Sequence, residues 1–255
     1  MNILMTGTEG MIGSRLCKWL SDKGHTVTQF QGDITVYDNW QKYYDRNFDF
    51  LIHLAALAGV RESFNNPEKY YEANVTGSLN AFNYARSCCR RMLYASSSNA
   101  YDWTGNPYAT TKKMNEVQGA CWQTIPNIGM RFHTVWPGRD DMLFKKLQRS
   151  EVTYINDQHY RDFIHVEDLL RAIELLIDNF MDVWHKQQVV DIGTGNSTSV
   201  SAVAKAMGYD GQYISENPVG ERVHTLADIK WLTELGWEPK RDILNQEDHI
   251  DVAQC

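Results

Sequence analysis

A tyrosine and a lysine four residues apart are the residues of this sequence best suited to acid–base chemistry. Tyr108 and Lys112 belong to the segment YATTK, and on a helix this spacing places both side chains on one face. The lysine ammonium would favour the phenolate form and so lower the pKa of the tyrosine. Such a phenol can take a proton from an alcohol hydroxyl near neutral pH. Pairs of this kind also occur by chance on many helices, so the pair requires further support.

Three consecutive serines supply part of that support. Ser96, Ser97 and Ser98 stand at the end of an apolar run, shortly before Tyr108. A serine hydroxyl at such a strand end can hydrogen-bond the same substrate oxygen that the tyrosine would deprotonate. The simpler alternative is that these serines only form a polar strand end. The glycine-rich turn described next makes that alternative less plausible.

Three glycines with the spacing G-x-x-G-x-x-G follow the first apolar run of the chain. Gly7, Gly10 and Gly13 lie between the apolar residues 1–5 and a segment with apolar residues at helical spacing over 11–22. A turn of this kind brings bare backbone N–H groups against a pyrophosphate at the positive end of a helix dipole. The spacing differs from the more common G-x-G-x-x-G, so a tight turn without a ligand is the alternative.

The elements that must position these residues alternate between strand and helix. Strands are predicted at residues 1–5, 26–30, 48–54, 92–95 and 129–135, and helices at 10–23, 36–44, 67–87 and 107–122. This alternation predicts an α/β fold with a doubly wound, Rossmann-type parallel sheet. We therefore expect a dinucleotide-binding domain at 1–136 and a smaller α/β substrate region at 137–255, with the chain free to cross between them and the cleft between the two parts.

Composition narrows the class of protein. The 255 residues carry a net charge of −7, which argues against a nucleic-acid surface. There is no run of eighteen apolar residues and no room for a signal peptide before the first strand, so we expect a cytoplasmic protein without a membrane span. The five cysteines lack C-x-x-C spacing and are expected to be free thiols, and no metal site is expected.

Several segments together resemble the extended short-chain dehydrogenase/reductases of the nucleotide-sugar epimerase group, most closely the UDP-glucuronate 4-epimerases. The matching segments follow the family order along nearly the whole chain: residues 6–13, 53–61, 74–77, 94–98, 108–113 with 115–116, 138–142, 161–168 and 235–239. The serine, tyrosine and lysine set is typical of the broad family. The segments AGVR at 58–61 and GRDDM at 138–142 are more specific to the glucuronate subgroup.

The resemblance implies roles for the matching positions. Ser97, with Ser98 as the near alternative, Tyr108 and Lys112 would be the catalytic set, in which Tyr108 is the acid/base and Lys112 orients the nicotinamide ribose. The implied cofactor is NAD, and the implied cofactor-binding residues are Gly7, Glu9, Gly10, Met11, Ile12, Gly13, Asp33, Ile34, Leu54, Ala55, Ala56, Asn74, Tyr108 and Lys112. The implied substrate-binding residues are Ser97, Ser98, Thr134, Arg139, Arg161 and Glu221.

Asp33 would contact the adenine, Arg161 a substrate phosphate and Glu221 the uridine ribose. Arg139 would lie near the C5 group of the sugar. A C5 carboxylate would suit a bidentate arginine, although a solvated loop charge is the plain alternative for Arg139.

The activity implied by the resemblance is NAD-dependent epimerisation at C4 of a UDP-sugar through a transient 4-keto sugar, with UDP-glucuronate to UDP-galacturonate as the best single expectation. A 4-keto-sugar reductase/epimerase and a non-catalytic nucleotide-sugar or dinucleotide binder are the alternatives. A dehydratase is disfavoured because Asn99 and Ala100, not a carboxylate, follow the serines. A homodimer that pairs through 67–87 and 107–122 is implied by analogy.

The sequence departs from the family pattern at three places, in two active-site loops and at the end of the second strand. The segment between Ser98 and Tyr108 is short, which removes part of the wall expected around the sugar. The second strand ends without the acidic residue that usually favours NAD over NADP, and no arginine replaces it. The family's Tyr-Gly-Pro reads Trp136-Pro137-Gly138. Shortened surface loops cost little stability, so the fold is expected to persist.

Overall fold

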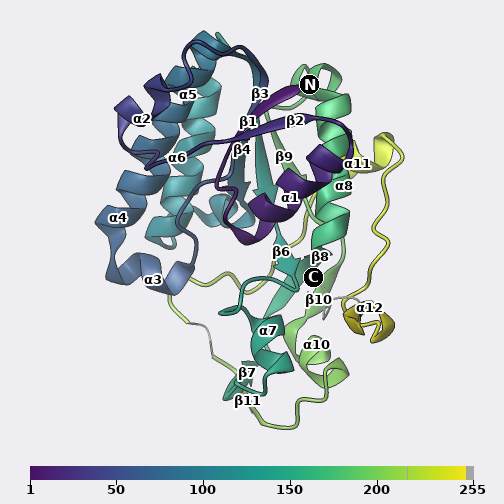
Figure 1. Cartoon of the computed structure of the whole chain (residues 1–255). Coiled ribbons are helices and arrows are strands. Elements are labelled where there is room, and N and C mark those ends of the chain that lie inside the picture. Colours follow the sequence, from purple (N-terminus) through teal and green to yellow (C-terminus); the bar gives the residue numbers. More distant parts are fainter. Residues whose placement is uncertain (217, 251–255) are drawn as a thin grey trace. The chain divides into compact units, whose positions relative to one another are not determined.

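The computed structural model describes residues 1–216 and 218–250, shown in Figure 1. The chain forms two compact units. The first contains residues 1–131 and 176–190, and the second contains 132–175 together with the described residues from 191 onward. The chain therefore leaves the first unit, returns to it for fifteen residues, and leaves it again.

The first unit contains the alternating strands and helices that the sequence predicts. Its elements are β1 (Asn2–Thr6), α1 (Met11–Asp22), β2 (Thr26–Gln29), α2 (Tyr37–Gln41), β3 (Phe48–His53), α3 (Val60–Asn65), α4 (Pro67–Tyr71), the π-helical η1 (Glu72–Thr76), α5 (Gly77–Cys88), β4 (Cys89–Ser97), the 3-10 helix η2 (Ser98–Asp102), α6 (Pro107–Cys121), β5 (Asn127–Phe132) and α9 (Phe180–Trp184). The elements α8 (Val166–Asp178) and β9 (Val189–Ile192) begin in one unit and end in the other.

A central sheet with the strand order β2-β1-β3-β4-β5-β9 organises these elements. The pairs β1–β2, β1–β3 and β3–β4 are all parallel. Figure 1 shows α5 and α6 over one face of the sheet and α1 over the other. The predicted α/β, Rossmann-type fold is therefore confirmed.

The two neighbours of β1 lie on opposite sides of it, β2 on one side and β3 on the other. The order of the strands thus reverses at β1. In open α/β sheets, ligands bind in the crevice outside the carboxyl ends of the strands at such a point. This topology directs attention to the loops that follow β1 and β3.

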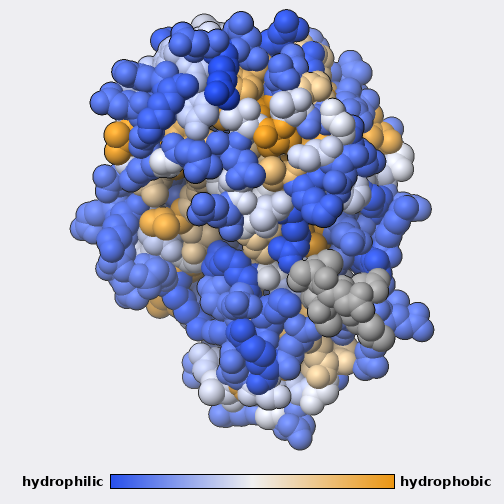
Figure 2. Space-filling view, viewed as in Figure 1, coloured by the Kyte–Doolittle hydropathy of each residue, from blue (hydrophilic) through white to orange (hydrophobic). Residues whose placement is uncertain are grey.

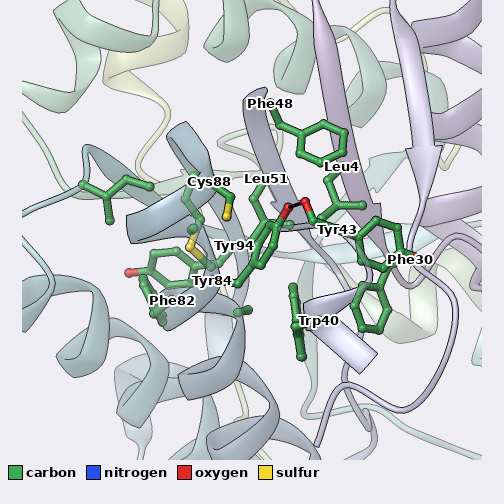
Figure 3. Close-up of a cluster of buried hydrophobic side chains, with 14 of the residues drawn as sticks. Leu4, Phe30, Trp40, Tyr43, Phe48, Leu51, Phe82, Tyr84, Cys88 and Tyr94 are labelled. Carbon is green, nitrogen blue, oxygen red and sulfur yellow. Dashed lines mark hydrogen bonds between the residues drawn. The ribbon is translucent and has the colours of Figure 1, made fainter. Parts of the chain in front are cut away.

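An aromatic cluster forms the core on the face covered by α2 and α5 (Figure 3). Trp40 is fully buried and packs 5.4 Å from the ring of Tyr84, whose hydroxyl donates to the carbonyl of Tyr43 at 2.9 Å. The remaining members include Leu4, Phe30, Leu51, Phe82, Met92 and Tyr94. Burial of such large side chains, at about 25 cal/mol per Å² of apolar surface, fixes α2 and α5 on the sheet.

The second unit is a smaller mixed α/β region. It contains β6 (Thr134–Trp136), α7 (Leu143–Gln148), β7 (Tyr154–Asn156), β8 (Tyr160–His165), β10 (Ser197–Ser199), α10 (Val200–Ala206), β11 (Gln212–Ile214), α11 (Lys230–Glu234) and α12 (Glu247–Ile250). A three-stranded sheet has the order β10-β8-β6, and β11 pairs with β7. Trp136, Phe144, Phe163 and Val203 belong to its own buried core.

Two predicted elements are wrong in detail. The strand predicted at 129–135 is interrupted at His133, so that β5 belongs to the central sheet and β6 to the second unit's sheet. The helix predicted at 67–87 consists of α4, η1 and α5, because the backbone widens to a π-helical turn at 72–76. The pattern of apolar residues alone cannot predict either change, because both changes leave the same apolar residues on the buried side.

The surface is predominantly hydrophilic in the view of Figure 2, in agreement with the mean hydropathy of −0.47. Within residues 1–216 and 218–250, every helix is too short or too polar to cross a membrane. Cys17, Cys88, Cys89 and Cys121 are free thiols, whereas Cys255 lies outside the described residues.

Candidate active site

The glycine-rich loop lies at the carboxyl end of β1, where the strand order reverses. Gly7 adopts a positive φ of 72°, and a Cβ atom there would lie 2.6 Å from the backbone nitrogen of Ala55. Gly13 is equally constrained, since its Cβ would lie 2.0 Å from the carbonyl oxygen of Gly7. Packing within the protein therefore explains two of the three glycines.

Packing constrains Gly10 less than the other two glycines. A Cβ atom at this position would meet, among the described residues, one atom within 4 Å, the carbonyl oxygen of Gly7 at 3.3 Å. Gly10 also caps the N-terminus of α1, where no side chain accepts the first helical N–H groups and no acidic residue occupies the first turn. Open space beside uncapped N–H groups at the positive end of a twelve-residue helix is what a pyrophosphate requires. The loop therefore fits a dinucleotide.

Substitutions of the two glycines should separate binding from folding. We expect Gly10→Ala to weaken NAD binding tenfold or more, because its methyl group would occupy the open space, while the melting temperature changes little. We expect Gly13→Ala to destabilise the protein by about 1–3 kcal/mol through overpacking. Cofactor titration and thermal unfolding of both variants are the measurements. Equal loss of stability in both would contradict a ligand-based explanation of Gly10.

Two further predicted cofactor residues are held firmly after β2. Asp33 Oδ1 accepts hydrogen bonds from the backbone nitrogen and the hydroxyl of Thr35, both at 2.8 Å. The carbonyl oxygen of Ile34 accepts from Trp40 Nε1 at 2.9 Å and from Asn80 Nδ2 at 3.0 Å. The exposed carboxylate of Asp33 is thus presented on a rigid turn.

Asn74 holds the loop that follows β3. Its amide exchanges two hydrogen bonds with the backbone of Leu57, at 2.8 and 3.0 Å, and its Nδ2 also donates to Thr111 Oγ1 at 3.0 Å. Residues Leu54, Ala55 and Ala56, which lead into this loop, are half-buried beside the glycine loop. Asn74 therefore connects the predicted cofactor loop to α6.

Lys112 is placed at the carboxyl end of β4. Its ammonium is buried, with 3% of the residue exposed, and donates to the carbonyl oxygen of Ala95 at 3.0 Å. Burial lowers the pKa of Lys112 to about 8. Ala95 lies two residues before Ser97, and Tyr108 lies one helical turn before Lys112 on α6. Lys112 and Ser97 therefore lie at one end of β4, and Tyr108 lies on the helix that carries Lys112.

Tyr108 is half-buried at the N-terminal end of α6, with its ring 6.2 Å from that of Tyr70 in an edge-to-face arrangement. The helix begins at this point because Asn106 caps it, accepting from the backbone nitrogen of Ala109 at 2.7 Å, and because Pro107 occupies the first turn. The cap sets the first residue of α6 and therefore the position of Tyr108 in the first turn of this helix.

Ser97 and Ser96 use their hydroxyl groups differently. Its Oγ accepts from the backbone nitrogen and from Nδ2 of Asn99, at 3.2 and 3.3 Å. Both partners donate, so neither bond uses the hydroxyl hydrogen of Ser97. Ser96, by contrast, donates its hydroxyl to Glu116 at 2.7 Å. Among these, Ser97 has the hydroxyl better suited to donate to a ligand.

His53 is a buried neighbour of this region at the end of β3. Its two ring nitrogens lie 2.8 Å from Thr6 Oγ1 and 3.1 Å from Ser78 Oγ. Burial and, secondarily, the charge of Lys112 lower the pKa of His53 to about 3. The imidazole is therefore neutral at physiological pH.

In the second unit, Arg161 and Glu221 are brought together around His159. Arg161 Nη2 lies 3.3 Å from His159 Nδ1, and Glu221 Oε2 lies 3.8 Å from the same nitrogen. Arg161 Nη1 donates to the carbonyl oxygens of Tyr160 and Val223, at 2.9 and 3.1 Å. Burial lowers the pKa of Arg161, which nonetheless keeps its charge.

Arg139 lies on a separate loop of the same unit. It makes a bidentate pair with Asp141, from Nε at 2.9 Å and from Nη2 at 2.8 Å, and 41% of its side chain is exposed. The hydrogen bonds from Arg139 hold the pKa of Asp141 below its usual range. Thr134 is on β6 and pairs with Phe163 of β8, two residues beyond Arg161. The guanidinium of Arg139 thus already displays the carboxylate-binding geometry that its predicted role requires.

Two residues of these clusters were missed in the sequence. His159 stands two residues before Arg161, so in extended chain both point to the same side. Glu116 stands four residues after Lys112 on α6 and so shares a helix face with it. The sequence spacing could have predicted that each of the two lies near a site residue. Only their contacts in the structure show that they are not ordinary surface residues. Within residues 1–216 and 218–250, no three His, Cys, Asp or Glu side chains group together as metal ligands.

The comparisons with known proteins agree with this geometry. The model of the NAD dependent epimerase/dehydratase family matches residues 3–119. Protein CapI of Staphylococcus aureus is 31% identical over 231 residues, which cover 69% of both chains. The probable UDP-glucuronate 4-epimerase of Rhizobium meliloti is 31% identical over 228 residues, which cover 68% of this chain and 67% of the relative. The chain belongs to the NAD dependent epimerase/dehydratase family.

The same fold occurs in solved structures. A UDP-glucose 4-epimerase of Thermotoga maritima, solved with UDP-glucose, superposes with a TM-score of 0.82 at 22% identity, over 100% of this chain and 99% of that one. MoeE5 in complex with UDP-glucuronic acid and NAD gives 0.80 at 24% identity, over 96% and 95% of the chains. The predictions of an enzyme of the epimerase class and of NAD as its cofactor are confirmed at the level of the family.

Proposed function

We propose that this protein epimerises C4 of a UDP-sugar, with UDP-glucuronate as its substrate and UDP-galacturonate as the product. The observation that carries the proposal is the hydrogen bond from Lys112 to Ala95, which lies two residues before Ser97 on β4, with Tyr108 one helical turn before Lys112 on α6. The name of one relative adds support, since the Rhizobium meliloti protein is described as a probable UDP-glucuronate 4-epimerase. MoeE5 was solved with UDP-glucuronic acid and also with UDP-glucose.

The roles of the chain's own residues follow from their surroundings. Tyr108 takes the proton of the C4 hydroxyl and later returns one, while the ammonium of Lys112 favours the phenolate. Ser97 donates its unused hydroxyl hydrogen to the C4 oxygen. NAD, held by the glycine loop and by Asp33, supplies the hydride acceptor and donor when it is bound. The residues themselves provide position, charge and exclusion of water.

Two side chains of the second unit have the chemistry that the rest of a UDP-sugar would need. Arg161 offers a half-buried guanidinium for a phosphate, and Glu221 offers a carboxylate for the ribose hydroxyls. Arg139 would bind the sugar carboxylate through its planar fork, in place of Asp141. We also propose a homodimer that pairs through residues 67–87, which form α4, η1 and most of α5, and through residues 107–122. Met114 and Val117 are exposed apolar residues on α6.

The direct test is incubation of the protein with UDP-glucuronate and NAD, followed by NMR analysis of the sugar. The proposal expects UDP-galacturonate at equilibrium with the substrate. If no epimer forms, and a 4-keto sugar consumes reduced cofactor instead, the protein is a reductase of the same family. If neither reaction occurs while NAD and UDP-sugars still bind, it is a non-catalytic binder.

Substrate choice is tested at Arg139. We expect Arg139→Ala to raise the KM for UDP-glucuronate tenfold or more and to change the KM for UDP-glucose less than threefold, because only the former has a carboxylate to lose. Arg139→Lys should restore little, since lysine lacks the fork. Arg149→Ala, which removes a nearby guanidinium paired with Glu151, is the matched control. Equal effects on both sugars would assign Arg139 to general loop structure.

A further inference from the structure

A buried carboxylate on α6 has no part in the proposed mechanism. Glu116 is 5% exposed and lies one helical turn after Lys112. It accepts hydrogen bonds from Ser96 Oγ at 2.7 Å, from Lys113 Nζ at 3.1 Å, and from Arg131 through Nε at 2.7 Å and Nη2 at 2.8 Å. Several charge-assisted hydrogen bonds therefore hold the Glu116 carboxylate in one position.

The donors come from different elements. Ser96 belongs to β4, Arg131 to β5 and Lys113 to α6 itself. The guanidinium of Arg131 also lies 4.2 Å from the ring centroid of Tyr101, in the short segment between the serines and α6. Burial by itself would raise the pKa of Glu116, but the hydrogen bonds from Arg131, Ser96 and Lys113 outweigh it and keep the pKa below its usual range. The group is therefore ionised and fully engaged.

Two side-chain hydrogen bonds consequently join α6 to the end of β4. Lys112 Nζ donates to the carbonyl oxygen of Ala95, and Ser96 Oγ donates to Glu116. On α6 the two bonded residues are one helical turn apart, which is about 6 Å along the helix axis. On β4 their partners are adjacent residues. Two such links restrict both the sliding and the rotation of α6 against β4, whereas one link would restrict neither fully.

The reacting groups lie next to these links. Ser97 follows Ser96 directly, and Tyr108 precedes Lys112 by one turn. We propose that Glu116, bonded to Ser96, is a positioning residue that sets the distance between the Tyr108 phenol and the Ser97 hydroxyl. This inference rests on the function proposed above. Misplacement of reacting groups by about 1 Å can cost on the order of 10²-fold in rate, so the link is expected to affect turnover.

The clean test is Ser96→Ala, because it removes the link to β4 without changing any charge or the ion pair with Arg131. We expect kcat to fall tenfold or more, while the KM for the UDP-sugar and the dissociation constant of NAD change less than threefold. Glu116→Gln should lower kcat at least as far. Ser96→Thr, which restores a hydroxyl, should recover part of the rate.

Two control variants address a purely structural role. Ser63 is as deeply buried as Ser96 and donates its hydroxyl to the carbonyl of Val60 at 2.6 Å, in a helix away from β4. Ser63→Ala should lower the melting temperature about as much as Ser96→Ala but leave kcat within twofold of the wild type. Lys113→Ala removes one donor of Glu116 without breaking the link to β4, and it should also leave kcat within twofold.

A measurement that needs no turnover separates this inference from the proposed function. Tyrosine labelled with ¹³C at Cζ reports the ionisation of Tyr108, whose resonance is identified by its absence from Tyr108→Phe. In Ser96→Ala we expect the Tyr108 titration to shift toward that of a free phenol, whereas Ser63→Ala should not shift it. If the wild type epimerises no UDP-sugar, the proposed function fails but this titration still decides the inference. An unchanged titration in Ser96→Ala, or a kcat matching that of Ser63→Ala, would overturn it.

Discussion

Replacement of Tyr108 by phenylalanine is expected to lower kcat about 10³-fold while the protein still binds NAD. The change removes one oxygen atom and leaves the ring in its edge-to-face contact with Tyr70, so the fold and the cofactor loop remain intact. General acid–base catalysis is worth about 10²–10⁴-fold in rate, and the phenol is the group proposed to hold the C4 proton. Steady-state kinetics together with a cofactor titration measure the two effects separately.

Tyr70→Phe is the matched control. Tyr70 is buried on α4 and contacts the ring of Tyr108, but its phenol has no part in the proposed chemistry. We expect its kcat to stay within threefold of the wild type. If Tyr108→Phe retains turnover, or if both variants lose it equally, Tyr108 is not the acid/base.

Replacement of Lys112 by methionine should abolish most activity and at the same time stabilise the protein. Activity falls because the buried ammonium, which favours the phenolate, is gone. Stability rises because burial lowers the pKa of Lys112 from 10.5 to about 8, which means that the folded state pays to keep the charge. A shift of this size corresponds to at most about 3 kcal/mol, and the unpaired carbonyl of Ala95 offsets part of it.

The sign of the pH dependence follows from proton binding. Below about pH 8 the lysine is charged in both the folded and the unfolded state, and the penalty is fully present. Between about pH 8 and 10.5 the unfolded state binds more protons than the folded state, so this group makes the free energy of unfolding rise with pH. Turnover should fall over the same range as the ammonium loses its proton.

Denaturant unfolding of the nucleotide-free protein at several pH values measures this contribution. The difference in stability between Lys112→Met and the wild type should be largest below about pH 8 and should decrease toward pH 10.5. Lys18→Met, at a side chain that is 77% exposed, should show no such trend. A difference that is constant with pH would contradict the burial of a charged Lys112.

The glycine turn, the strand–helix alternation and the Tyr108–Lys112 spacing were readable in the sequence because each is a local pattern. Glycine spacing reports backbone geometry, apolar periodicity reports which face of an element is buried, and a four-residue interval reports a shared helix face. The interruption at His133 and the π-helical turn at 72–76 were not readable, because they alter backbone pairing without altering the order of apolar and polar residues.

By itself, then, the sequence determined the fold class and the family, and it predicted the residues that would do the chemistry. Only the tertiary structure decided how Ser96 and Ser97 use their hydroxyl groups, which glycine packing constrains least, and that Glu116 joins α6 to β4. The physical reason is that these properties depend on where the folded backbone places the neighbouring atoms, which the order of residues alone does not specify. Ser96 and Ser97 are chemically identical until Glu116 and Asn99 are placed beside them.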